Sequence, residues 1–134
     1  MKTIKGPGIF LAQFAGDAAP FNTLEGMAGW AAKLGFTGIQ IPTWDARLFD
    51  LKKAAESQGY CDELLGIASR AGVAITELST HLQGQLVASH AAYDVLFGSF
   101  APPEIAGDLK ARQAWAVQQL IWAAKATVGF HHLE

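Results

Sequence analysis

The chain has 134 residues, of which 51% are hydrophobic and 16% are charged, and its formal net charge is −2 at pH 7. This length fits one domain, and the weakly negative charge argues against a protein that binds nucleic acid or an anionic membrane through its surface charge. Typical soluble domains carry about 25% charged residues, so we expect a second subunit to cover part of this surface.

Cysteine content and hydropathy indicate the compartment. The single cysteine, Cys61, permits no internal disulfide and no cysteine-based zinc cluster, and it is typical of a reducing environment. No apolar run approaches the roughly 18 residues of a membrane span, and the N-terminal segment is too rich in glycine for a secretory signal. The sequence therefore predicts a cytoplasmic protein without a membrane or nucleic-acid partner.

The first predicted elements are a buried strand and an amphipathic helix. Residues 8–14 (GIFLAQF) form a short apolar run, which is typical of a strand in a parallel sheet. Asn22 or Thr23 is placed to cap a helix that runs to about Leu34, and Gly35 ends this helix in left-handed geometry. Its apolar stripe is predicted to consist of Leu24, Met27, Ala28, Ala31 and Leu34.

A second strand and helix follow in the same rhythm. Residues 37–41 (TGIQI) predict a strand that Pro42 stops, and residues 52–58 predict an extra helical turn. A longer helix is expected over residues 62–70, with Gly72 just after its C-terminal end.

The third unit has a longer connection. Residues 73–80 (VAITELST) predict the third strand, and the long segment that follows is expected to contain one or two helical turns over residues 90–97. Asp108 is predicted to cap a final helix over residues 109–127. We expect its main apolar stripe to comprise Leu109, Gln113, Ala116, Leu120 and Ala124, with Val117 and Ile121 beside it.

The alternation of strands and helices defines the fold class. Short glycine-containing loops between helix and strand predict βαβαβ units, with a parallel sheet and right-handed crossovers. We predict one α/β domain over residues 1–134, a partial or truncated TIM-type barrel of three to four parallel strands. Because such a barrel needs about 250 residues, the chain corresponds to its N-terminal half, with residues 128–132 as a stunted strand or a tail.

An incomplete barrel favours association. Three parallel strands leave two open edges and one uncovered face, and exposed edges and apolar patches invite contact with another chain. We expect a homodimer or a larger homo-oligomer, with either Trp115 and Trp122 or the open sheet edge in the contact.

The histidines do not predict a metal site. The final dipeptide, Leu133-Glu134, matches a cloning junction that often precedes a histidine tag, so we do not interpret the two histidines before it as ligands. His81 and His90 are nine residues apart in a loop, which is not a typical ligand spacing. A metal site held by this chain alone is not expected.

Polar residues interrupt the apolar strands. Gln13, Gln40 and Glu77 each lie within one predicted strand, and Glu77, Ser79 and His81 share one parity along the third. In a TIM barrel, side chains that face the lumen near the C-terminal strand ends form the active site. These five residues therefore either line one polar lumen or are hydrogen-bonded core and edge residues.

Three further features mark the C-terminal ends of the strands. His81 follows the third strand, where an imidazole acts as a base, a ligand or a hydrogen-bond donor to a substrate. Gln83 comes two residues later and is included as a substrate-binding candidate. Trp44 follows the second strand, and it either stacks on a sugar ring at the mouth of a pocket or packs on a helix.

The segments LAQF, AAKLGFTGIQIPTW and LLGIASRAGVAITELSTHLQGQLV carry a family resemblance. Together they are similar to the N-terminal part of the sugar phosphate isomerase/epimerase family, which are xylose-isomerase-like TIM barrels. The same superfold includes apurinic endonucleases. The resemblance covers roughly residues 8–127, and its most characteristic pieces are the Leu-Gly-Phe-x-Gly turn that leads to Gln40 and the Leu-Ser-Thr-His strand end at His81.

The resemblance implies a metal-assisted enzyme. In such families a divalent ion (Mn, Mg or Zn) polarises the carbonyl and hydroxyl of a sugar while hydrogen moves between adjacent carbons. The metal ligands usually come from later strands, so we expect no cofactor for this chain alone. By match, His81 and Trp44 carry over as substrate-side groups. In the endonuclease branch a histidine at a similar strand end binds zinc.

Three functional hypotheses remain open. In the favoured one the chain is an N-terminal fragment of a sugar isomerase or epimerase, inactive alone and associating into oligomers. In the second, an oligomer rebuilds a site in which His81 and Glu77 are catalytic and Trp44, Gln40 and Gln83 bind the sugar. In the third, the chain is a non-enzymatic binding or inhibitory module that reuses the fold.

Overall fold

A parallel sheet of three strands lies at the centre of the fold, in the order β1-β2-β3. The strands are β1 (Gly8–Phe10), β2 (Gly38–Pro42) and β3 (Ala74–Ser79). Sheet order and direction confirm the predicted α/β class and its βαβαβ pattern. The first strand is shorter than predicted, because the chain turns sharply after Phe10 and the amides of Phe14 and Ala15 donate to the Leu11 carbonyl.

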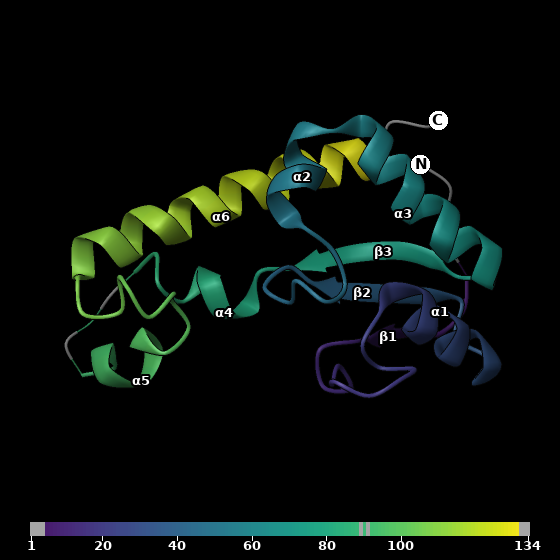
Figure 1. Ribbon diagram of the computed structural model, residues 1–134, viewed down its shortest axis with the longest axis horizontal. Coiled ribbons are helices and arrows are strands. Elements are labelled where there is room, and N and C mark those ends of the chain that lie inside the picture. Colours follow the sequence, from purple (N-terminus) through teal and green to yellow (C-terminus); the bar gives the residue numbers. More distant parts are fainter. Residues whose placement is uncertain (1–4, 89, 91, 132–134) are drawn as a thin grey trace.

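The computed structural model describes residues 5–88, 90 and 92–131 (Figure 1). The dipeptide Leu133-Glu134 and His132 lie outside the described residues. Helices α6 and α3 lie along one side of the sheet in Figure 1, and α5 lies below the first turns of α6, away from the strands. The helices are α1 (Leu24–Lys33), α2 (Leu51–Glu56), α3 (Gln58–Ala71), α4 (His81–Gly84), α5 (Asp94–Gly98) and α6 (Leu109–Phe130).

Helix α1 begins and ends where the sequence predicts. The Thr23 hydroxyl accepts a hydrogen bond from the Gly26 amide at 3.1 Å, and Gly35 adopts the left-handed φ of 87°. Leu24, Met27, Ala28 and Ala31 are buried as expected. The prediction for Leu34 was wrong, because this C-terminal cap residue turns away from the sheet and is 59% exposed.

Two helices lie between β2 and β3, and the second is longer than predicted. The predicted start at Asp62 was wrong, because the Ser57 hydroxyl already accepts a hydrogen bond from the Tyr60 amide. Asp50 caps α2 in the same way, through the Lys53 amide at 2.9 Å. The C-terminal glycine, Gly72, has the expected left-handed φ of 87°.

Helix α6 runs past its predicted end. Asp108 caps it as expected and accepts hydrogen bonds from two backbone amides. The predicted stunted strand or tail beyond residue 127 was wrong for residues 128–130, because Phe130 is buried in the main core and extends the helix contact with α3. Close packing continues at Gly129, where an added Cβ would lie 2.7 Å from the Cys61 sulfur.

The buried stripe of α6 also differs from the prediction. Arg112, Ala116, Ala123, Ala126 and Phe130 are its buried residues. Of the predicted stripe only Ala116 is buried, while Leu109, Val117 and Ile121 are 47%, 41% and 44% exposed. Apolar residues surround this helix on every side, so its own pattern does not select one face.

The core lies between the helices and one face of the sheet. Ile39, Ile41 and Ile75 are buried there against residues of α1, α3 and the second half of α6. A smaller cluster around Leu86, Ala101 and Ala116 joins the connection after β3 to the first half of α6. The helices thus cover one face of the sheet, and the residues of the other face are available for a site.

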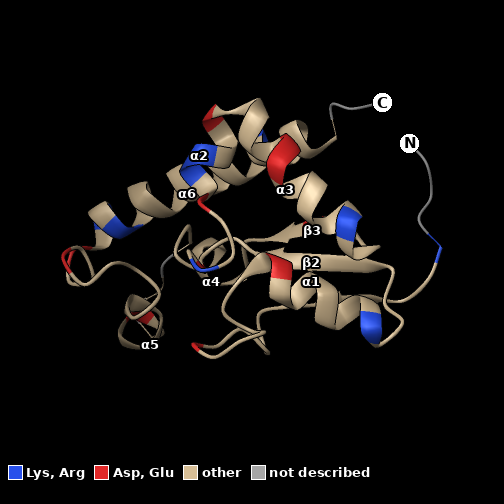
Figure 2. Cartoon of the chain, turned by 45° about the vertical axis from the view of Figure 1, so that its right-hand side comes forward, with Lys and Arg blue, Asp and Glu red and all other residues tan. Residues whose placement is uncertain are grey.

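Charged side chains are few and dispersed. Figure 2 shows Lys, Arg, Asp and Glu spread over helices and loops, with most of α6 uncharged. Across the described stretches of the chain, no helix is both long and apolar enough to cross a membrane.

Candidate functional site

The C-terminal end of the sheet gathers one aromatic ring from each strand or the residues that follow it. Phe10 ends β1, Trp44 follows β2, and His81 begins the short helix after β3. The Trp44 ring centroid lies 6.2 Å from that of Phe10, edge to face, and 6.5 Å from that of His81. Trp44 is half-buried and His81 is exposed. The structure therefore brings the predicted pair Trp44 and His81 together, with Phe10 added.

A polar row crosses the sheet beside these rings. Gln40 is the register partner of Phe10 on one side and of Glu77 on the other. Side chains of register partners point to the same face of a sheet. Gln40 is half-buried and Glu77 is exposed. We call the face that carries Phe10, Gln40, Glu77 and Ser79 the open face.

A bulge in β3 puts Glu77 on the open face. Ile39 pairs with Ile75, but the next residue of β2 pairs with Glu77, so Thr76 is the extra residue. Without it, Glu77 would share the parity of Ile75 and point into the core. The Thr76 hydroxyl donates to the Ile39 carbonyl at 3.1 Å and holds the irregularity in place. Bulges of this kind redirect side chains next to functional sites.

The lumen prediction fails for Gln13. It lies in the turn after β1 and is exposed, because the strand ends three residues earlier. Ser79 lies on the open face, beside its register partner Pro42 in β2. Its carbonyl accepts hydrogen bonds from the amide and the hydroxyl of Thr43, at 2.9 and 2.8 Å.

Gln83 does not lie at the surface of the mouth. It is fully buried in α4, and its Nε2 donates to the Thr43 hydroxyl at 2.9 Å. This amide lines a separate hollow with a volume of about 390 Å³, bounded by Trp44, by residues around α2 and by α6. We call this cavity the indole hollow, because Trp115 and Trp122 also line it.

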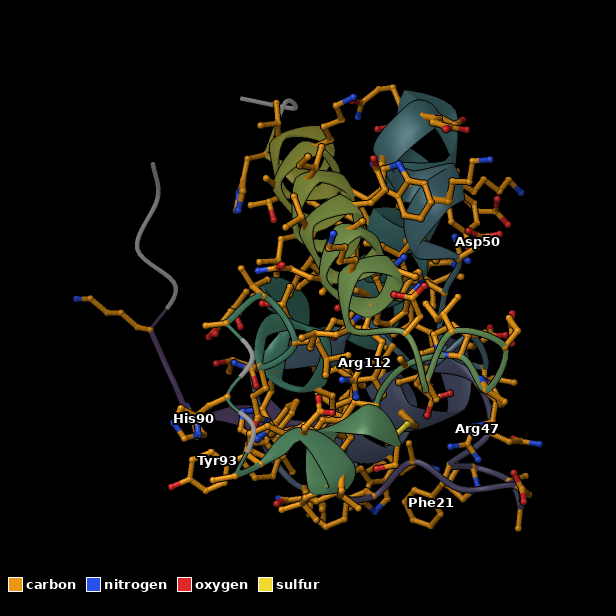
Figure 3. The ribbon with its side chains drawn as sticks, turned by 90° about the vertical axis from the view of Figure 1, so that its left-hand side faces the viewer. Phe21, Arg47, Asp50, His90, Tyr93 and Arg112 are labelled. Carbon is orange, nitrogen blue, oxygen red and sulfur yellow. The ribbon has the colours of Figure 1, made fainter. Side chains whose placement is uncertain are left out.

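The loop that carries Trp44 is fixed by an ion-pair network. Arg47 donates from Nε and Nη2 to the two carboxylate oxygens of Asp45, at 2.9 and 2.7 Å, and from Nη1 to Asp17 at 2.6 Å. Hydrogen bonds from the Arg47 side chain hold the pKa of the Asp45 carboxyl below its usual value. The ion pair between Arg47 and Asp17 ties the loop after β2 to the loop after β1, and Figure 3 shows Arg47 at the edge of the molecule.

The open face offers groups that bind polyols. A carboxylate, a carboxamide and an imidazole supply acceptors and donors, and the indole supplies an apolar surface for the carbon face of a sugar ring. Among the residues that the structure describes, no three His, Cys, Asp or Glu side chains lie close enough to hold a metal ion.

Sequence reasoning missed two residues of the site. Phe10 was treated as an ordinary apolar strand residue, although its position at the strand end was a usable signal. Thr76 gave no signal, because a bulge depends on pairing with the neighbouring strand.

No model of a known protein family matches the chain. No curated protein is significantly similar to it in sequence.

Proposed function

We propose that this chain forms the first βα units of a xylose-isomerase-like TIM barrel, and that its open face binds a sugar or sugar phosphate. The observation that carries the proposal is the row of Gln40 and Glu77 beside the rings of Trp44 and His81, at the C-terminal ends of parallel strands. This is the end of a parallel α/β sheet where ligands bind.

The strand arrangement supports the barrel interpretation. Strand order β1-β2-β3 with parallel pairing follows the chain, as in a barrel that curls in one direction. The apolar core lies on the helix side, and the polar row lies on the opposite side, which is the lumen side of a barrel. In a complete barrel, further strands enclose the lumen. In this proposal another copy of the chain supplies those strands and covers the open face.

Four residues of the site have a role in the proposal. Glu77 removes a proton from one carbon of the sugar and returns it to the neighbouring carbon, while His81 protonates the carbonyl oxygen and takes the proton of the adjacent hydroxyl, which completes an isomerisation. Return of the proton to the opposite face of the same carbon completes an epimerisation. Gln40 hydrogen-bonds a hydroxyl, and Trp44 stacks on the ring. The chain alone is proposed to bind weakly and to turn over no substrate until the lumen is closed.

Calorimetry with aldoses, ketoses and their phosphates tests the binding. We expect millimolar binding that Glu77→Gln and His81→Ala weaken at least about fivefold. His90→Ala is the matched control, because His90 is an exposed histidine in the connection after β3 and lies outside the polar row. Isomerisation and epimerisation are followed by NMR in the same samples, with and without Mn²⁺ or Mg²⁺.

The outcomes separate the proposal from the non-enzymatic alternative. Sugar binding that depends on Glu77 and His81 supports a barrel half-site. Absence of binding to every sugar tested, at protein concentrations that favour association, would remove the proposal. A defined protein partner bound without any sugar affinity would then favour a binding or inhibitory module.

A further inference from the structure

The outer edge of β3 is bordered by a groove. Two hollows, of about 520 and 180 Å³, lie against this strand and share Ile75, Phe130 and His131. The larger one lies at the start of β3 and is also lined by the C-terminal half of α3, whereas the smaller one continues along β3 as far as Leu78. We call the two hollows together the edge groove. It shares no residue with the indole hollow and only Glu77 with the open face.

The backbone of β3 is unpaired along this groove. Within the described part of the chain, β3 is the last strand on its side of the sheet. The Ala74 amide donates to the residue before β2, and the Ser79 carbonyl accepts from the residue after β2. Because backbone groups alternate in direction along a strand, those of Ile75 and Leu78 point to the outer edge. They form a row on which another strand can pair.

The groove offers apolar hollows for the side chains of such a strand. Alternate side chains of a strand point to the same side, so two residues separated by one would both point towards α6. The larger hollow has room for an aromatic ring and the smaller one for a branched aliphatic side chain. In strand addition, the main chain supplies affinity and pockets of this kind supply specificity. The apolar residues that line the two hollows include Leu65, Ala68, Val73, Ile75, Leu78 and Phe130.

A free peptide fits the groove better than a second copy of the chain. In β3 of a second copy, Ile75 is 7% exposed and already belongs to the core of its own subunit. The other edge strand, β1, has only three residues. Neither strand therefore has side chains free to fill both hollows. Pairing of two β3 strands would also bring two Glu77 carboxylates onto one face, and like charges in adjacent strands are destabilising.

Glu77 adds a preference for positive charge. Its side chain is exposed on the open face, and it forms no ion pair with another described residue. In an added strand, the residue between the two groove-filling side chains points to the open face, beside Glu77. A basic side chain there forms a cross-strand ion pair.

We propose that the edge groove binds an extended peptide, which adds to β3 as a fourth strand. The peptide carries an aromatic and a branched aliphatic side chain two residues apart, with a basic residue between them. This proposal does not rest on sugar binding, because both hollows lie beside α6, on the helix side of the sheet.

Two probe peptides test the binding, acetyl-Thr-Phe-Lys-Val-Thr-amide and acetyl-Thr-Val-Lys-Phe-Thr-amide. Both orders are used because the direction of the added strand decides which side chain reaches the larger hollow. Calorimetry is performed at a concentration at which light scattering shows the monomer, or the lowest oligomer that the protein forms. We expect one of the two peptides to bind. Absence of binding by both would overturn the proposal.

Backbone methylation of the better probe tests the strand pairing. N-methylation of its Phe and Val removes the amide donors on one side of the strand, and N-methylation of its Lys removes the donor on the other side. Only the donors that face β3 form the ladder. We therefore expect one methylated form to bind at least about tenfold more weakly and the other to bind like the parent peptide. Equal affinities of the two methylated forms would overturn the proposal.

Two variants of α3 locate the binding. Ser69 is exposed and lines the larger hollow, so Ser69→Trp should fill this hollow and weaken the probe at least about tenfold. Arg70→Trp is the matched control, because Arg70 is the exposed neighbour and does not line the hollow. Equal affinities of the two variants would overturn the proposal. A dimer that Ser69→Trp alone dissociates would also overturn it and assign the groove to a second copy.

The charge preference is tested with norleucine in place of the lysine of the probe. This change should weaken binding to the unmodified protein about threefold and leave binding to Glu77→Gln unchanged. The same loss with both proteins would contradict the role of Glu77.

Discussion

Gly129 lies where α6 packs closely against α3. Its absent side chain leaves room for Cys61, whose sulfur would lie 2.7 Å from an added Cβ, and Gln58 donates to its carbonyl at 2.8 Å. We predict that Gly129→Ala lowers the free energy of unfolding by about 1–3 kcal/mol, because the added methyl overpacks this contact. Urea unfolding followed by circular dichroism measures the effect.

Gly29→Ala is the matched control for that substitution. Gly29 is also in a helix, but a Cβ there would meet nothing within 4 Å. The change should raise the stability by about 0.5–1 kcal/mol through helix propensity. Equal effects of the two substitutions would contradict the close contact at Gly129.

The stability of the protein should depend on pH through Asp45, in the loop that carries Trp44. Its carboxyl has a lowered pKa because the Arg47 side chain donates to it. A group with a lowered folded-state pKa stabilises the protein above its unfolded pKa, which is about 3.9 for aspartate. This contribution is lost as the pH falls through the lower, folded value.

The pH dependence is measured by comparing the unmodified protein with Asp45→Asn. We predict that the variant is less stable at pH 7, and that the two urea midpoints converge as the pH falls below about 4. Asp17→Asn removes a fully exposed partner of the same arginine and should have a smaller effect. A stability difference that stays constant from pH 7 to pH 2 would be inconsistent with the ion pair.

The residues of the site show what the sequence can and cannot predict. Trp44 and His81 were placed correctly after the ends of their strands, and Gln40 within the second strand, because strands and their ends follow from local apolar runs and turn residues. Gln83 was expected at the mouth but is buried, since its position depends on how α4 packs against α6. Local pattern carries no information on such contacts.

Among the elements, α5 contacts a buried cation from α6. The Arg112 side chain is 3% exposed and donates from Nη2 to the Asp94 carboxylate and from Nη1 to the Asp94 carbonyl. Figure 3 shows Arg112 between α6 and α5. On α5 itself, Val95 and Leu96 are 94% and 66% exposed, whereas Phe97 packs against the smaller apolar cluster. The position of this helix therefore depends on the arginine together with Phe97.

We predict that Asp94→Asn loosens α5 without unfolding the sheet. Removing one partner of a fully buried ion pair costs about 3–5 kcal/mol. Because Asp94 is 42% exposed, we expect a loss of about 1–2 kcal/mol. Limited proteolysis should cleave the variant faster within residues 85–107. Glu104→Gln, an exposed acid in the same segment, is the control, and equal cleavage of both variants would contradict the prediction.

Some helix ends were predictable, although the start of α3 and the end of α6 were not. The caps at Thr23 and Asp108 and the left-handed glycines are local features, and each was predicted from its type and spacing. The buried face of α6 was not, because alanine and large apolar residues occur around its whole circumference. Packing against α2, α3 and α4 selects the face that is buried. The bulge in β3 likewise depends on the register with β2.

At the scale of the whole molecule, two apolar or partly apolar surfaces remain uncovered in the described part of the chain. The first is the part of the open face around Gln40 and Glu77, where Gln40 is half-buried and Glu77 is exposed. The second is a stripe on α6 formed by Val117, Ile121 and Val128, which are 41%, 44% and 64% exposed. Trp115 and Trp122, expected in a subunit contact, instead line the indole hollow. The open sheet edge is the other predicted contact, and the open face adjoins it.

We predict that the protein associates through the open face. Light scattering during size exclusion should show a mass that rises from monomer to dimer as the protein concentration increases. Gln40→Lys should abolish this rise, because a symmetric contact would bring two added positive charges together on an otherwise buried surface. Ile121→Lys is the matched variant on the α6 stripe and should leave the association unchanged. A dimer that Ile121→Lys disrupts and Gln40→Lys preserves would place the contact on α6. A monomer at every concentration would mean that the open face stays uncovered.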